Sequence, residues 1–176
     1  MFDMGMRPGP SNWPPFTNPG RTYRFYTGKP VLPFGFGLSY TTFTYVLLSG
    51  VSSDRVTLAK DLVTDKKALQ AEAASYYINV TNTGKIAADD VVLGFLTPPG
   101  AGTNGVALQT LFGFERIHLK PGQSKVVYLG AQGQHFTHVL ANGVRVSWPG
   151  RYGVHFGVHE TLAHGMGYAE ATTHVT

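Results

Sequence analysis

The stretch HETLAH contains two histidines and one glutamate, His159, His164 and Glu160. These are residue types that bind zinc in proteins. A zinc protease uses H-E-x-x-H, which places two imidazoles one helical turn apart on one helix face. Here the histidines are five positions apart, so a helix would not align them. His155 and His159 share one face of an expected strand, but at ~3.3 Å per residue they lie ~13 Å apart. We therefore expect no metal site and no cofactor.

The carboxylates are a second group of candidate residues, because glycoside hydrolysis needs two of them, one on either side of the scissile bond. Asp89 and Asp90 are neighbours in the sequence. Adjacent residues of a strand point to opposite faces, so this pair cannot converge on one bond. Glu115 lies on an expected strand beside Arg116, an ordinary surface arrangement. The chain also has no G-x-S-x-G nucleophile elbow. We expect none of these residues to be catalytic.

The triplet Asn79-Val80-Thr81 is an N-glycosylation sequon. It lies in SYYINVTN, where Tyr76, Ile78 and Val80 alternate with polar neighbours. This alternation places Asn79 on the polar face of a strand. We predict that Asn79 is a glycosylation site if the chain is secreted.

Composition excludes several classes of function. The net charge is +4, but the 14 Lys and Arg residues are scattered along the chain, whereas nucleic-acid binders concentrate them on one face. There is no cysteine, so disulfides and thiolate chemistry are excluded, although this does not fix the compartment. No apolar run approaches the ~20 residues that span a membrane. Residues 1–4 do not resemble the start of a signal peptide.

Turn signals and alternating stretches dominate the sequence from Tyr40 to His159. The 22 glycines and 11 prolines favour many turns, and they separate runs rich in β-branched and aromatic residues. We predict about seven short strands, the pattern of an all-β sandwich of immunoglobulin-like or fibronectin type III-like topology. In the stretch 58–74 we expect a strand and a loop, with a helix as the alternative.

Before these strands lies a segment rich in aromatic residues, glycine and proline, which we expect to be an extended arm. The expected organisation is therefore an arm over residues 1–39, a β-sandwich over 40–160 and a C-terminal tail over 161–176. The arm carries large apolar side chains, and such a segment normally packs on something.

The arm and the strands together resemble a known family. The stretch FGFGLSYTTF (residues 34–43) is similar to the connector found in glycoside hydrolase family 3 enzymes, both β-glucosidases and β-xylosidases. The preceding GRTYRFYTGKPV looks more like the branch of β-xylosidases and α-L-arabinofuranosidases. Downstream, VTNTGKIAADDVVLGFL, LFGFERIHLKPGQSKVV and WPGRYGVHFGV resemble the fibronectin type III-like domain at the C-terminal end of these enzymes.

The resemblance implies an accessory role. In this family a (β/α)₈ barrel carries the nucleophile, and an α/β sandwich usually supplies the acid/base residue. Neither maps onto these residues, so the resemblance implies a non-catalytic, stabilising domain whose partners are those two missing domains. We expect no cofactor, no nucleic acid and no membrane as partners, and polysaccharide is the further partner that stays open.

The resemblance also gives the arm two alternative roles. Its aromatic residues are expected to be anchors of a domain interface. The alternative is sugar stacking, for which the candidates are Trp13, Tyr23 and Tyr26. A different reading of the whole chain is a stand-alone module that binds carbohydrate or protein, which predicts a row of exposed aromatic residues on one strand face.

Overall fold

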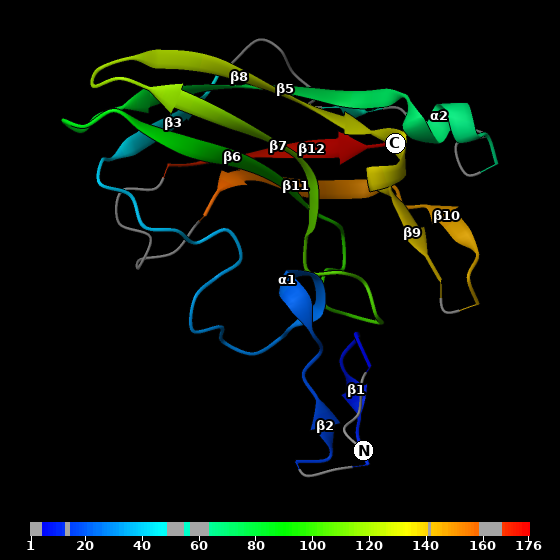
Figure 1. Cartoon of the computed structure of the whole chain (residues 1–176). Coiled ribbons are helices and arrows are strands. Elements are labelled where there is room, and N and C mark those ends of the chain that lie inside the picture. Colours follow the sequence, from blue (N-terminus) through cyan, green and yellow to red (C-terminus); the bar gives the residue numbers. More distant parts are fainter. Residues whose placement is uncertain (1–4, 13–14, 49–54, 57–63, 141, 159–166) are drawn as a thin grey trace.

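Two β-sheets packed face to face form the main body of this computed structural model, with the N-terminal arm beneath one of them (Figure 1). The structure describes residues 5–12, 15–48, 55–56, 64–140, 142–158 and 167–176. The elements in chain order are β1 (Gly9–Pro10), β2 (Thr17–Asn18), α1 (Thr22–Phe25), β3 (Phe43–Leu47), β4 (Arg55–Val56), α2 (Lys66–Gln70), β5 (Glu72–Asn82), β6 (Ala88–Thr97), β7 (Thr110–Leu119), β8 (Ser124–Gln132), the 3₁₀ helix η1 (Gly133–Phe136), β9 (Thr137–Val139), β10 (Arg145–Ser147), β11 (Gly150–Gly157) and β12 (Tyr168–Val175).

The sandwich pairs a three-stranded sheet with a five-stranded one. The smaller sheet has the order β3-β5-β8, and the larger has the order β4-β12-β11-β6-β7. All the pairings are antiparallel except that of β12 with β4. The predicted all-β sandwich is confirmed. In the described residues, these two sheets together hold eight strands, where the sequence pattern indicated about seven.

The core lies between the sheets and follows from the period of two that each strand shows in sequence. In β5, buried and partly exposed residues alternate from Ala74 to Asn82, which confirms the predicted inner face. On β11 the inward residues are Tyr152, Val154 and Phe156. Burial of these large apolar side chains, at ~25 cal/mol per Å², supplies the main stabilising free energy.

Tyrosine hydroxyls in the core keep their hydrogen-bond partners. The Tyr152 hydroxyl donates to the backbone oxygen of Trp148 at 2.8 Å, four residues back along the chain. The Tyr76 hydroxyl and the Thr173 hydroxyl lie 2.8 Å apart and join β5 to β12 across the sandwich. Burial raises the pKa of Tyr152, so this hydroxyl stays protonated and available as a donor.

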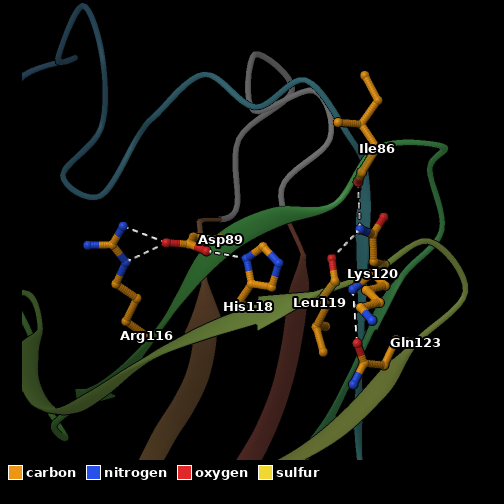
Figure 2. Close-up of polar contacts among 8 residues, drawn as sticks. Ile86, Asp89, Arg116, His118, Leu119, Lys120 and Gln123 are labelled. Atoms are coloured by element: carbon orange, nitrogen blue, oxygen red, sulfur yellow. Dashed lines mark hydrogen bonds and ion pairs between the residues drawn. The ribbon is translucent and has the colours of Figure 1, made fainter.

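A buried amide joins the two sheets at one end of the sandwich. Asn82 is completely buried, and its Nδ2 donates to the backbone oxygens of Ile86 and Leu119, both at 2.9 Å (Figure 2). Its Oδ1 accepts from the Thr41 hydroxyl at 2.7 Å and from the Gly84 amide at 3.0 Å. The turn expected at NTGK is thus held by the side chain of its first residue, because a buried amide must find partners for its polar atoms.

Two expectations about the chain are corrected. Residues Tyr168–Val175, expected in a C-terminal tail, form β12, which pairs with β11 along its whole length. Their alternation was hidden because Ala, Thr and Glu give weak apolar contrast. Of the stretch 58–74 the structure describes residues 64–74, where the alternative, a short helix, α2, precedes the start of β5. Asp65 caps this helix by accepting from the Lys67 amide at 2.8 Å.

Candidate functional site

The arm packs against the outer face of the five-stranded sheet, the face that points away from the core. We call this the arm face and define it by Leu93 and Phe95 of β6, His155 of β11 and Tyr168 of β12. Phe95 is only 2% exposed although it lies outside the core cluster between the sheets. It is the arm that covers this side chain, and the arm is therefore part of the fold rather than a loose tether.

Aromatic rings form a continuous row across this interface. Tyr23 stacks on Phe34 at 4.3 Å between ring centroids, and both rings meet the edge or face of Phe95, at 5.8 and 6.1 Å. Phe95 stacks in turn on His155 at 5.0 Å, and His155 lies 6.2 Å from Tyr168. Offset and edge-to-face aromatic pairs of this kind add ~0.5–1.5 kcal/mol each beyond their burial.

A cavity of about 680 Å³ opens beside this row. Its walls come from α1 and the following arm residues on one side and from β6, β11 and β12 on the other; among the lining residues are Tyr23, Tyr26, Phe34, Gln109, His155 and Tyr168. Burial, and after it the neighbouring Glu170 carboxylate, raises the pKa of Tyr168 to about 12. The volume lies within the range of ~300–1,000 Å³ that is usual for small-molecule sites.

Local backbone contacts fix the arm in place. The Leu108 amide donates to the backbone oxygen of Arg24 at 2.6 Å, and the Leu111 amide donates to the Tyr23 hydroxyl at 3.4 Å. Gly20 has a φ of +84°, and a Cβ there would lie 2.3 Å from the backbone oxygen of Phe25. Only glycine fits this position, which turns the chain into α1.

Beyond these anchors, the arm leaves large apolar side chains in solvent. Val31 is 90% exposed, Leu38 94% and Tyr40 93%. They lie along one stretch of chain in which Phe34 is held against the sheet. An exposed apolar stretch that is fixed on both sides by packed aromatic residues marks a surface of interaction.

The predicted stacking residues have different fates. Trp13 lies outside the described residues. Tyr23 belongs to the aromatic row and is packed on the domain's own sheet, so one of its ring faces is already occupied by Phe34. Tyr26 lines the cavity and is 36% exposed, so of the two described candidates it is the more accessible.

The sequon lies on the opposite side of the molecule. Asn79 is on β5, the central strand of the three-stranded sheet, and points outward as the alternation indicated. Its cross-strand neighbours are Val46 and Val126, which are both exposed. Tyr77 and Tyr128 meet edge to face at 5.1 Å on the same face. We call this surface, with these five residues, the free face.

The carboxylates take the separate positions that their adjacency in sequence indicated. Asp89 points to solvent and accepts from Arg116 Nη2 at 2.5 Å, while His118 Nδ1 lies 2.6 Å from its other oxygen (Figure 2). The His118 hydrogen bond, followed by that of Arg116, lowers the pKa of Asp89. Asp90 turns inward and accepts from the Tyr45 hydroxyl at 2.8 Å, and burial raises the pKa of its carboxyl.

Glu115 accepts a hydrogen bond from Lys125 Nζ at 2.8 Å, an ion pair between β7 and β8, which are edge strands of the two different sheets. Its partner is thus Lys125 of β8 rather than the adjacent Arg116. Arg116 reaches across to Asp89 instead, because the two lie on facing strands of one sheet. Asp89, Asp90 and Glu115 therefore each bind a side chain of this same domain.

The stretch HETLAH and His159 lie outside the described residues. Within the described ranges no three His, Asp or Glu side chains gather closely enough to hold a metal ion. None of the helices in that part of the chain has the length and hydropathy needed to cross a bilayer.

Sequence reasoning missed three residues of the site. Phe95 and His155 were expected on strands and Tyr168 in the C-terminal tail, but nothing in their spacing shows that the arm folds back over them. A signal was present: the apolar residues Val91, Leu93 and Phe95 alternate on the face of β6 opposite to the core residues Val92 and Leu96. A strand that is apolar on both faces is covered on both faces.

Comparison with known proteins defines the class of the domain. A family model described as a fibronectin type III-like domain matches residues 90–160. A solved β-glucosidase from Listeria innocua superimposes with a TM-score of 0.64 at 22% identity, over 84% of this chain and 18% of that one. The main body is therefore a fibronectin type III-like β-sandwich.

The relatives extend the match to the arm. A probable exo-1,4-β-xylosidase of Aspergillus terreus is 40% identical over 153 residues, which are 86% of this chain and 18% of the relative. A probable exo-1,4-β-xylosidase of Aspergillus fumigatus is 38% identical over 168 residues, which are 92% of this chain and 20% of the relative. A solved glycoside hydrolase family 3 exo-β-xylosidase covers 99% of this chain and 22% of its own, with a TM-score of 0.77 and 26% identity. The chain is thus similar over most of its length to a segment of these xylosidases, and it spans about one-fifth of the length of the relatives that it matches.

Proposed function

We propose that this chain is a non-catalytic accessory domain of a family 3 glycoside hydrolase, and that its arm docks the domain onto the rest of that enzyme. The parent reaction would be hydrolysis of terminal β-D-xylosyl or β-D-glucosyl bonds. The barrel and the α/β sandwich implied by the resemblance would be the docking partners. The arm would be the connector, and the sandwich would run from about residue 40 through the end of β12 at Val175.

The observation that carries the proposal is the division of the arm into two kinds of apolar residue. Tyr23 and Phe34 are packed on the domain itself, whereas Val31, Leu38 and Tyr40 are almost fully exposed. The first kind fixes the position of the second. The relatives support a partner outside this chain, because about four-fifths of their length lies outside the match.

The mass of the native protein tests whether this chain is part of a larger hydrolase. An antibody raised against the sandwich should detect a band several times larger than 19.0 kDa in extract or culture medium. The pure 176-residue chain should show no turnover of an aryl β-xyloside or an aryl β-glucoside. A native band at 19.0 kDa, or turnover by the pure chain, would contradict the proposal.

Paired substitutions in the full-length polypeptide test the docking role. Leu38→Asp places a charge in the proposed interface, and the matched control Val46→Asp places one on the free face. We expect Leu38→Asp to lower the calorimetric melting temperature of the whole enzyme and Val46→Asp to leave it nearly unchanged. Equal effects of the two substitutions would rule out the arm as the docking surface.

Sugar binding in the cavity is the second candidate function, favoured by its aromatic walls and by the accessible ring of Tyr26. The tyrosine hydroxyl and Gln109 supply polar groups for sugar hydroxyls. Calorimetric titration with xylo-oligosaccharides should then show binding that Tyr26→Ala removes and Tyr128→Ala, on the free face, keeps. If no heat of binding is detected, the cavity is only part of the domain interface.

A further inference from the structure

Three arginines converge on a second cleft, on the side of α1 away from the aromatic row. The cleft has a volume of about 480 Å³ and lies between the arm and the hairpin of β9 and β10. Arg7 of the arm, Arg24 of α1 and Arg145 of β10 line it, together with His135 and His138. We call it the arginine cleft. None of its lining residues is an Asp or a Glu.

The positions of the guanidinium groups are set by packing. Two of them lie over the ring of Phe25, with the Arg7 Cζ 5.7 Å and the Arg24 Cζ 5.3 Å from its centroid. Arg145 Nη1 donates to the Thr137 hydroxyl at 2.6 Å, and Arg7 Nη2 reaches the Val139 backbone oxygen at 3.4 Å. The cations are thus held in place by an aromatic ring and by neutral oxygens. In the described part of the chain no ion pair balances their charge.

One nitrogen of Arg24 lacks a hydrogen-bond partner in the part of the chain that the structure describes. Its Nε is buried, and within the described residues no atom accepts a hydrogen bond from it. A buried donor without an acceptor is costly, and a buried charged donor more so. Burial and then the charges of Arg7 and Arg24 lower the pKa of the neighbouring His138, as expected where positive charge is concentrated.

We propose that the arginine cleft binds one carboxylate group. A carboxylate accepts two parallel hydrogen bonds from a guanidinium fork, and it would neutralise the charge that the fold gathers at this point. The carboxylate has two sources, a side chain from the rest of the parent hydrolase or a free acid such as a uronic acid sugar. The inference does not depend on the docking role of the arm, since the cleft lies within this chain.

The test is an NMR titration of the ¹⁵N-labelled 176-residue chain, observing the Nε–H signal of Arg24. Sodium acetate and sodium D-glucuronate are compared with sodium chloride at equal ionic strength. We expect a saturable shift with the carboxylates and none with chloride. Arg24→Gln and Arg145→Gln should each weaken binding by about tenfold or more, as measured on the backbone amides of the cleft. The matched control Arg151→Gln changes an exposed arginine on β11 and should leave the affinity unchanged.

Two comparisons complete the experiment. If glucuronate binds at least about tenfold more tightly than acetate, the ligand is a free sugar acid. If the two bind equally, the cleft recognises only the carboxylate group, which an acidic side chain of the parent hydrolase would provide. Circular dichroism melting establishes whether each variant is folded. If Arg24→Gln does not fold, the affinity of Arg145→Gln is used in its place. A Nε–H signal that moves no more with carboxylates than with chloride, or equal affinity in Arg24→Gln and Arg151→Gln, overturns the proposal.

Discussion

The two outer faces of this sandwich differ although the sheets beneath them share one core. The arm face is apolar and is covered by Tyr23 and Phe34. The free face is mixed: Asn79 lies between Val46 and Val126, and nothing in the described chain folds over it. The difference shows that the outer face of the five-stranded sheet is suited to burial under the arm, whereas the outer face of the three-stranded sheet is suited to contact with water.

The largest expected effect comes from the covered aromatic ring. Phe95→Ala should lower the free energy of unfolding by about 4 kcal/mol, because it empties the centre of the aromatic row and leaves a cavity under the arm. Val126→Ala on the free face, where the side chain is 49% exposed, should cost less than about 0.5 kcal/mol. Urea denaturation followed by circular dichroism measures both. Similar losses would mean that the two faces are equivalent.

A smaller effect is expected at the turn that directs the arm into α1. Gly20→Ala introduces a side chain at positive φ against the backbone oxygen of Phe25, and should destabilise the packed arm by about 2 kcal/mol. Gly37→Ala is the control, since that glycine has open space around it. Hydrogen exchange should show faster exchange at Leu108 and Leu111 in Gly20→Ala only, because their amides bond to α1.

At the uncovered end of the arm face, acid should have a modest effect. The pKa of Asp89 is depressed in the folded state, so its contribution is present above the ordinary carboxyl pKa of ~3.9 and is lost as the pH falls through the folded value. Wild type should therefore lose more stability than Asp89→Asn between about pH 5 and pH 2. Parallel unfolding curves for the two proteins over this range would exclude the contribution.

The free face is where modification should have the least effect on folding. If the chain is made through the secretory pathway of a yeast host, we expect an N-glycan at Asn79. The product should shift in mobility after endoglycosidase treatment, and Asn79→Gln should not. Their melting temperatures after deglycosylation should agree closely, because Asn79 is outside the core. A wild-type product without a glycan would remove the free face as a modification surface.

Much of the fold could be predicted from sequence, because alternation in β5 and β11 reports directly which residues face the core. The placement of Asp89 and Asp90 on opposite faces follows from the same geometry. The return of the arm over Phe95 could not be predicted, since it depends on contacts between residues 23, 34 and 95 that no local pattern encodes. The strand β12 was missed because its residues give weak apolar contrast.

The position of β12 in the sheet determines when, during synthesis of the chain, the larger sheet can be completed. It lies inside the five-stranded sheet, between β11 and β4, and its residues are the last part of the sandwich to be synthesised. Until these residues have been synthesised, one edge of β11 has no partner, and β4 has none in the described sheet. An unpaired edge of this kind invites pairing with another chain. The larger sheet therefore cannot be completed before β12 has been synthesised, and premature termination before Tyr168 should yield a product that aggregates.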